Sequence, residues 1–192
     1  MKNIKALSVS ILLGAILAGC ASQGGVTGDN SKRKSVTVVQ TSRGAVITSD
    51  ERVLFDSGKS AVKPEGQVFI DRVAGILKDK TKANVVVEGH TDNTGGADLN
   101  MRLSEARAQS VKAALTKAGV EGKRISAKGI GLSSPVADNN TPEGRQANRR
   151  TEILVLGEKL ENIGGDSLGD RLAEGFANFM KDPGAALKSA FN

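Results

Sequence analysis

The sequence predicts an α/β two-layer sandwich, in which a mixed sheet carries helices on one face. Short runs rich in β-branched residues alternate with longer segments whose apolar residues recur at helical spacing. These segments follow one another in the order β-α-β-α-β-β, and amphipathic helices in that order favour packing on a sheet. The 192 residues suffice for one domain, expected at residues 35–157, with an N-terminal hairpin and a C-terminal helical tail at residues 158–192.

The domain is expected to begin with a hairpin, because residues 35–56 have a strand-like composition. Valine and threonine runs flank a turn signal at residues 42–44, and residues 53–55 form a short apolar run of the buried type. A helix is predicted next, since Pro64 suits a first helical position. Its apolar stripe consists of Phe69, Ile70, Val73, Ile76 and Leu77.

The central segment, residues 84–118, is predicted to contain a strand, a loop and a long helix. Residues 85–87 are a β-branched run, and residues 93–96 have the composition of a loop. Gly119 suits the position that closes a helix. The expected apolar stripe, which leaves most charges on the opposite face, consists of Leu99, Leu103, Ala106, Ser110, Val111 and Ala114.

The last part of the domain is predicted to hold two more strands and a short helix. Residues 124–130 read as a strand, residues 131–140 as a loop, residues 142–148 as a short helix and residues 151–156 as the final strand. These elements complete the predicted order.

The tail carries a second amphipathic pattern. Its apolar positions are Leu168, Leu172, Phe176, Phe179 and Met180, with Leu187 and Phe191 further on. Such a stripe could pack on its own domain, pair with a protein partner or a second copy, or lie on a membrane. The sequence leaves these alternatives open.

Composition excludes several classes of function. The formal net charge of +6 would suit nucleic acid, an anionic membrane or an acidic polymer. Nucleic acid is disfavoured, because Tyr and Trp are absent and the Phe residues do not interleave with basic residues. The single Cys excludes an internal disulfide, and no segment after residue 19 reaches the ~18 apolar residues of a membrane span. We expect no cofactor.

The N-terminus predicts secretion and lipid anchoring. Residues 1–19 have the charged start and short apolar region of a signal peptide. Residues 17–20, Leu-Ala-Gly-Cys, are similar to a bacterial lipobox, which implies cleavage before Cys20 and a diacylglyceryl thioether with an acylated amine, palmitate for example, on that residue. The alternative is an ordinary signal peptide that happens to end in Cys.

A tether is expected between the lipid and the domain. Residues 20–34 are rich in Gly, Ser and charge, a composition typical of flexible linkers. Ala21, where Asp would favour retention in the inner membrane, suggests sorting to the outer membrane. We therefore expect a lipid-anchored protein whose domain faces the periplasm.

Two opposite charges are predicted to share a groove. Asp92 lies just past the end of a strand, where α/β sheets tend to hold ligands. Asn100 and Arg107 are seven residues apart, two turns along one helix face, with Ser104 between them. A carboxylate, an amide and a guanidinium could line one groove and suit a ligand that carries both an ammonium and a carboxylate.

Three motif blocks carry a resemblance to a known family. GHTDNTG stands at residues 89–95, LSEARA at residues 103–108 and EGRQANRR at residues 143–150, with Asn100 between the first two. In this order and spacing they resemble the OmpA-like domain, over residues 45–157. The resemblance implies non-covalent binding of peptidoglycan through the diaminopimelate of its stem peptide.

The resemblance also implies a set of binding residues. Asp92 matches the residue that takes the amino group of diaminopimelate, and Arg107 matches the one that takes a carboxylate. Asn100 and Arg149 match further ligand contacts, and Thr94 could assist through its hydroxyl or backbone. Arg149 and Arg150 are adjacent at a strand entry and should point in opposite directions, so that Arg150 could instead form a structural ion pair.

One departure from the family and several alternatives remain. Gly58 stands where some members have an Asn that contacts the ligand, so we expect that contact to be missing or replaced by backbone. His90 is the only His and, with one carboxylate, makes a poor metal site, so we expect it to be packed or hydrogen-bonded. An enzyme, such as a wall-modifying hydrolase, is not expected. The main alternative function is an envelope adaptor that recruits a partner through residues 158–192.

Overall fold

The computed structural model describes residues 35–182. The predicted signal peptide at residues 1–19, the lipidation at Cys20 and the tether at residues 20–34 lie outside the described residues. The same holds for the apolar positions of the tail beyond residue 182. Within the described part, no helix is both long enough and apolar enough to cross a membrane.

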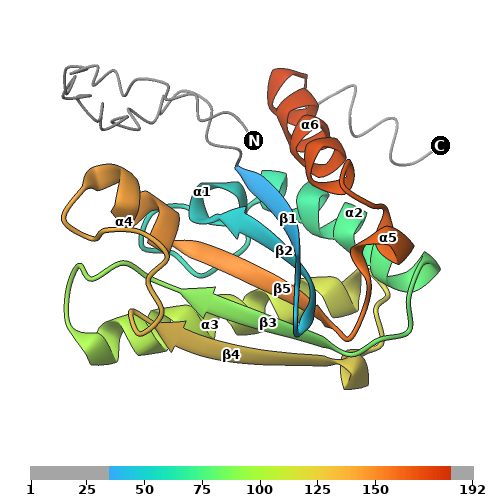
Figure 1. Ribbon diagram of the computed structural model, residues 1–192. Coiled ribbons are helices and arrows are strands. Elements are labelled where there is room, and N and C mark those ends of the chain that lie inside the picture. The colour runs from blue at the N-terminus through green and yellow to red at the C-terminus, as the bar shows by residue number, and fades with distance from the viewer. Residues whose placement is uncertain (1–34, 183–192) are drawn as a thin grey trace, which may run out of the picture. The chain divides into compact units, whose positions relative to one another are not determined.

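The centre of the fold is a five-stranded mixed sheet (Figure 1). In sheet order its strands are β1 (Val36–Thr41), β2 (Gly44–Asp50), β5 (Arg150–Leu156), β3 (Val85–His90) and β4 (Ile125–Gly131). The β1–β2, β2–β5 and β3–β5 pairs are antiparallel, whereas β3 and β4 run parallel. The N-terminal hairpin and the mixed sheet confirm the predicted fold class.

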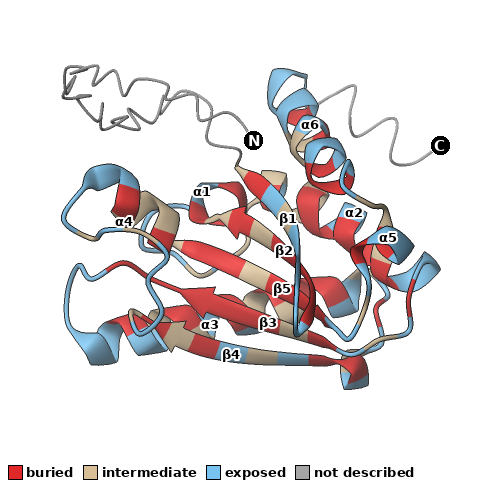
Figure 2. Ribbon diagram, in the orientation of Figure 1, coloured by how far each residue is buried: buried red, intermediate tan, exposed pale blue. Residues whose placement is uncertain are grey.

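Helices cover one face of this sheet. The helical elements of the described part are α1 (Glu51–Leu54), α2 (Pro64–Asp79), α3 (Ala97–Lys117), the 3-10 helix η2 (Gly122–Arg124), α4 (Pro142–Asn148), α5 (Leu160–Ile163) and α6 (Leu168–Lys181). The long helix α3 packs against β3 and β4, α6 packs against β1, and α2 contacts both α3 and α6. Figure 2 shows the buried residues gathered along the strands and on the inward sides of these helices.

The apolar core lies between the helices and the sheet. The predicted stripe of α2 is confirmed, since Phe69, Ile70, Val73 and Leu77 are buried. They belong to one apolar cluster with Val85 of β3, whose strand alternates inward and outward residues. Burial of such side chains is the main favourable contribution to folding.

Two glycines let α3 lie directly on the sheet. A Cβ at Gly89 would collide with the backbone oxygen of Ser104, and one at Gly129 would lie 2.7 Å from the backbone nitrogen of Glu105. Only glycine allows so close an approach. The close packing sets the start of α3 beside the loop that follows β3, and it thereby positions the functional site.

This packing corrects the predicted buried face in the first half of α3, whereas Val111 and Ala114 are buried as predicted. Leu99 is 57% exposed and Ala106 is also exposed, whereas Asn100, Ser104 and Arg107 are buried. In this half of the helix, the buried positions therefore lie one residue after the expected ones. A polar, small residue fits against the glycine backbone, where the Ser104 hydroxyl accepts a hydrogen bond from Gly131 N at 2.9 Å.

Two element boundaries also differ from the prediction. Residues 51–54 form the one-turn helix α1, although residues 35–56 had the composition of strands. The Asp50 carboxylate accepts a hydrogen bond from Arg52 N at 2.8 Å and so caps this turn. Strand β4 begins one residue later than expected, because Arg124 belongs to η2. Gly119 follows α3 with φ of +95°, as predicted for a closing residue.

The described part of the tail packs on its own domain. Leu168, Leu172 and Phe179 are buried, and α6 contacts both α2 and β1. Gly169 brings α6 close to the backbone of Val38, where an added Cβ would lie 3.2 Å from the nitrogen. Most of the apolar stripe is thus used within the domain, although Met180 stays exposed.

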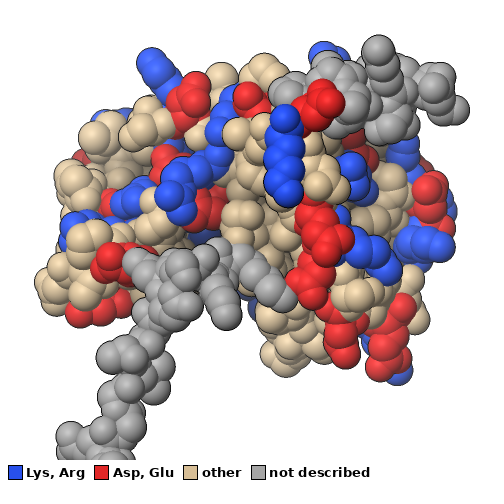
Figure 3. All heavy atoms as spheres, turned by 90° about the horizontal axis from the view of Figure 1, so that it is seen from above, with Lys and Arg blue, Asp and Glu red and all other residues tan. Residues whose placement is uncertain are grey.

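The surface carries both signs of charge. On the face drawn in Figure 3, basic and acidic side chains are interspersed and do not gather into one continuous basic track. Such a track is the electrostatic footprint of nucleic-acid binding.

Candidate functional site

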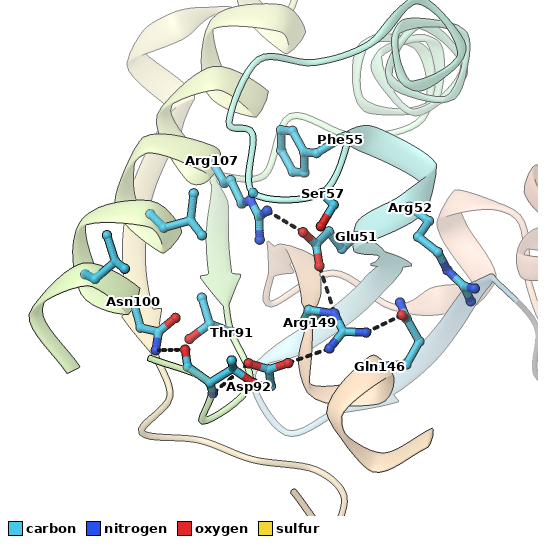
Figure 4. A pocket seen from close by; sticks show the side chains of 14 residues that line it. Glu51, Arg52, Phe55, Ser57, Thr91, Asp92, Asn100, Arg107, Gln146 and Arg149 are labelled. Carbon is cyan, nitrogen blue, oxygen red and sulfur yellow. Dashed lines mark hydrogen bonds and ion pairs between the residues drawn. The ribbon is translucent and has the colours of Figure 1, made fainter. Parts of the chain in front are cut away.

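A pocket of about 430 Å³ opens where four segments meet (Figure 4). These are α1 with the loop after it, the loop after β3, the first turns of α3, and the end of α4. All five residues predicted to bind a ligand line this pocket: Asp92, Thr94, Asn100, Arg107 and Arg149. The chain therefore brings together residues that lie far apart in the sequence.

The carboxylate of Asp92 is fixed by its own loop. Thr94 N donates a hydrogen bond to Asp92 Oδ1 at 2.9 Å, and Asn100 Nδ2 donates to the Thr94 carbonyl at 2.9 Å. Asp92 thus forms a short turn of the kind that Asp favours. The side chain of Asn100 couples this loop to α3, so the position of the carboxylate depends on both segments.

The guanidinium of Arg107 is held from three sides. Its Nε donates to the Lys59 carbonyl at 2.9 Å, its Nη2 donates to the carboxylate of Glu51, and its centre lies 5.2 Å from the ring centroid of Phe55. Arg107 is only 3% exposed. A buried guanidinium with such partners has a fixed orientation.

Arg149 links the two sides of the pocket. It lies at the end of α4, its Nη1 pairs with the carboxylate of Asp92, and its Nη2 donates to the side-chain oxygen of Gln146. Its Nε lies 3.0 Å from Glu51 Oε2. The neighbouring Arg150 points to the other face of the sheet and pairs with Glu152 at 2.7 Å, as the alternation along a strand predicts.

Glu51 is a pocket residue that the sequence did not reveal. It is 7% exposed, and its two oxygens contact Arg107 and Arg149. Four side chains thus form a chain of ion pairs in which the sign of the charge alternates. Their order is Arg107, Glu51, Arg149 and Asp92, and we call them the charge chain. Figure 4 shows this order around the pocket. An acidic residue between a strand and a buried apolar run was the only available signal.

Asp92 remains ionised in this setting. Burial alone would raise its pKa, but hydrogen bonds from the Thr94 backbone and from the Arg149 guanidinium outweigh burial and lower the pKa below its usual value. Near neutral pH the two ends of the charge chain are therefore a carboxylate and a guanidinium. They complement an ammonium and a carboxylate on one ligand.

One further polar group faces this pocket without a partner. The hydroxyl of Thr91 is buried and has no hydrogen-bond partner among the described residues. A buried polar group in that state needs a water or ligand atom to satisfy it. Gly58 also lines the pocket, with φ of +69°, and a Cβ there would meet nothing within 4 Å. Position 58 therefore offers open space.

His90 lies on the other face of the sheet, away from Asp92's partners. It is 4% exposed, and its ring nitrogens have no hydrogen-bond partner among the described residues. Burial and the charge of Arg150 outweigh the opposing effect of Glu152 and Glu88 and lower the pKa of His90 to about 4. His90 is therefore neutral at pH 7 and packed, as predicted, and within residues 35–182 it forms no hydrogen bond through its ring.

The acidic neighbours of His90 are already paired with arginines. Ligand atoms of Glu88, His90 and Glu152 lie within 4.8 Å of one another, which is close enough to consider a metal ion. Arg43 lies 2.7 Å from Glu88, and Arg150 lies 2.7 Å from Glu152. Two guanidinium groups thus already supply the positive charge that a metal would bring. We interpret this group as a structural ion-pair cluster.

A protein-family model and several known proteins match the chain. The OmpA family model matches residues 54–149. The chain is 42% identical over 127 residues to the probable lipoprotein YiaD of Escherichia coli strain K12, which covers 66% of this chain and 58% of that protein. It is 36% identical over 153 residues to the outer-membrane lipoprotein YfiB of Pseudomonas aeruginosa, which covers 78% of this chain and 90% of that protein.

Solved structures show the same fold. The cell wall anchor of the T6SS from Pseudomonas aeruginosa matches with a TM-score of 0.60 and 38% identity, over 67% of this chain and 92% of that one. The periplasmic domain of Helicobacter pylori MotB matches with a TM-score of 0.57 and 26% identity, over 62% of this chain and 80% of that one. The chain thus spans little more than half the length of some relatives and nearly all of others.

Proposed function

Because this chain belongs to the OmpA family, we propose that it binds peptidoglycan non-covalently, through the diaminopimelate of the stem peptide. One observation carries the proposal. Asp92 and Arg107 line one pocket and form the two ends of its charge chain, with opposite sign. A similar structure is the cell wall anchor of a secretion system, and that likeness supports the same kind of ligand.

Each predicted residue has a role in the proposed complex. Asp92 binds the ammonium of diaminopimelate, and Arg107 binds the neighbouring carboxylate. Asn100 and Thr94 hold the loop that carries Asp92, while Arg149 keeps the Asp92 carboxylate aimed at the pocket. The unpaired Thr91 hydroxyl adds a further polar contact. The ligand completes a ring of alternating charges.

The expected affinity is weak. Charge-assisted hydrogen bonds contribute ~1.5–3 kcal/mol each. Several of them, less the cost of ordering a flexible peptide, suggest roughly 4–6 kcal/mol for one site. That free energy corresponds to dissociation constants on the order of millimolar to tens of micromolar. Such binding suffices for a tethered domain that faces a polymer with many copies of its ligand.

The lipid anchor belongs to the same proposal. Two relatives are named lipoproteins, one of them of the outer membrane, and Cys20 follows a lipobox-like sequence. Acyl chains on Cys20 would hold the protein at the outer membrane while the domain binds the wall in the periplasm. Cys20→Ala should release the protein into the soluble periplasmic fraction. Membrane association of that variant would contradict the anchor.

The decisive test of wall binding is sedimentation with purified sacculi. Asp92→Ala and Arg107→Ala should fold and lose retention. Matched controls are Asp71→Ala and Arg72→Ala, which remove the same charges from the exposed side of α2 and should be retained normally. Unchanged retention of both pocket variants would reject the proposal. The proposed role is binding alone, so incubation should release no soluble wall fragments.

A further inference from the structure

The pocket contains two positive and two negative side chains in its charge chain. We infer that Glu51 determines the charge selectivity of the site, because it makes this group neutral, so that the pocket accepts a zwitterion and disfavours a plain anion. The inference rests on the proposed function, since it concerns the same ligand-binding pocket. It assigns a role to a residue that lies outside the family match at residues 54–149.

Each of the two arginines has partners other than Glu51. Arg107 is also fixed by the Lys59 carbonyl at 2.9 Å and by the Phe55 ring at 5.2 Å. Arg149 is also fixed by Asp92 and Gln146. What Glu51 adds to both is negative charge in a buried position, where charges are poorly screened.

Without that charge, the same pocket would attract anions. Arg107 and Arg149 would then face Asp92 alone, and the group would carry a net positive charge. Arg52, at the pocket rim, does not change this balance, because it pairs with Asp50 at 3.2 Å and its side chain is 74% exposed. A ligand carboxylate near Arg107 would lose its competitor and gain affinity, with or without an ammonium beside it.

With Glu51 present, a ligand needs both charges. A carboxylate that approaches Arg107 also approaches the Glu51 carboxylate, which repels it. An ammonium on the same ligand offsets that repulsion by its attraction to Asp92. The neutral group therefore favours a ligand that ends in both an ammonium and a carboxylate over a ligand of the same length that ends in a carboxylate alone. Specificity here depends on repulsive as well as attractive contacts.

The test compares two peptide ligands on the full chain, purified in detergent. The first is a stem tripeptide that ends in meso-diaminopimelate, and the second contains 2-aminopimelate instead, so that only the distal amino group is missing. Calorimetric titration of the wild type should give about tenfold tighter binding of the first. Glu51→Gln should strengthen the second by about tenfold and the first by a smaller factor, so that the ratio falls towards one.

Two variants separate charge from other effects. Glu51→Asp keeps the charge with a shorter side chain and should keep the selectivity of the wild type. Glu88→Gln removes the same charge from the opposite face of the sheet, where Glu88 pairs with Arg43, and should also keep it. Thermal unfolding of each variant checks the fold.

Three results bear against the inference or its premise. Equal binding of the two peptides by the wild type would overturn the inference, even if Glu51→Gln did not fold. Parallel weakening of both peptides in Glu51→Gln would also overturn it, since Glu51 would then only position the arginines. Binding of neither the peptides nor sacculi by the wild type would instead reject the proposed function itself.

Discussion

Two clusters of arginines and carboxylates lie on opposite sides of the same sheet. In the pocket, Glu51 bridges two arginines, and the ends of the charge chain are not paired with each other. On the other face, each of Glu88 and Glu152 has its own arginine. Each cluster contains two arginines and two carboxylates, so the number of charges does not distinguish them. Connectivity does, because only in the pocket do an acid and a base form the two ends of one chain, where a single ligand can contact both.

Variants of the adjacent residues Arg149 and Arg150 test most directly whether the two clusters have separate roles. Arg150→Ala should lower the free energy of unfolding by about 2–4 kcal/mol, because it leaves the partly buried Glu152 carboxylate without its arginine, while the folded protein still binds sacculi. Arg149→Ala should lower sacculus binding by about tenfold with a smaller loss of stability, since Arg149 is more exposed. Chemical denaturation and sedimentation on both variants check the result. Equal profiles would show that the two clusters are not separate.

The pH dependence of stability reports on the ion-pair cluster around His90, on the face of the sheet opposite the pocket. The unfolded chain protonates His90 near its usual pKa of 6.5, whereas the folded protein does so only near 4. Stability that is present above pH 6.5 should therefore fall as the pH is lowered through this window, by roughly 3 kcal/mol. Denaturation curves between pH 7 and pH 4 measure the effect. His90→Gln should lack this slope, and a retained slope would assign it to other groups.

The pH dependence of binding reports on the pocket instead. The pKa of Asp92 is lowered in the folded protein. The Asp92 side chain therefore keeps its negative charge above the usual pKa of Asp and loses that charge only as the pH falls below this usual value. Binding of the diaminopimelate peptide should be constant from pH 7 to about 5 and should fall by about tenfold once Asp92 is protonated. Calorimetric titration of the peptide at a series of pH values, from pH 7 down to below the usual pKa of Asp, measures this dependence. A decline between pH 7 and 6 would be inconsistent with binding through Asp92.

The smallest expected effect concerns the support of the Asp92 loop. Asn100→Ala removes the hydrogen bond to the Thr94 carbonyl and should weaken peptide binding by about fivefold, a net loss typical of one hydrogen bond. Arg102→Ala, at an exposed position of the same helix, is the matched control and should change binding little. Equal affinities of Asn100→Ala and the wild type would show that the loop holds its position without α3.

Periodicity and motif order were enough to predict most of this fold. The hairpin, α2, the central strand and the five pocket residues lie where the sequence placed them. Glu51 was missed because its hydrogen-bond partner Arg107 is 56 residues away and local composition favoured a strand. The buried face of the first half of α3 was predicted wrongly because close packing on Gly89 and Gly129 overrode the apolar pattern there, whereas Val111 and Ala114 are buried as predicted. Both errors arise from tertiary contacts that local patterns do not contain.

The position of α6 has a practical consequence. The family match ends at residue 149, yet β1 is the outermost strand on its side of the sheet and α6 lies against it. In a shortened protein that lacked residues 158–182, β1 would be an exposed edge strand, and such a strand can pair with a strand from another molecule. Soluble fragments intended for wall-binding assays should keep the C-terminal helix, or self-aggregation will be mistaken for avidity.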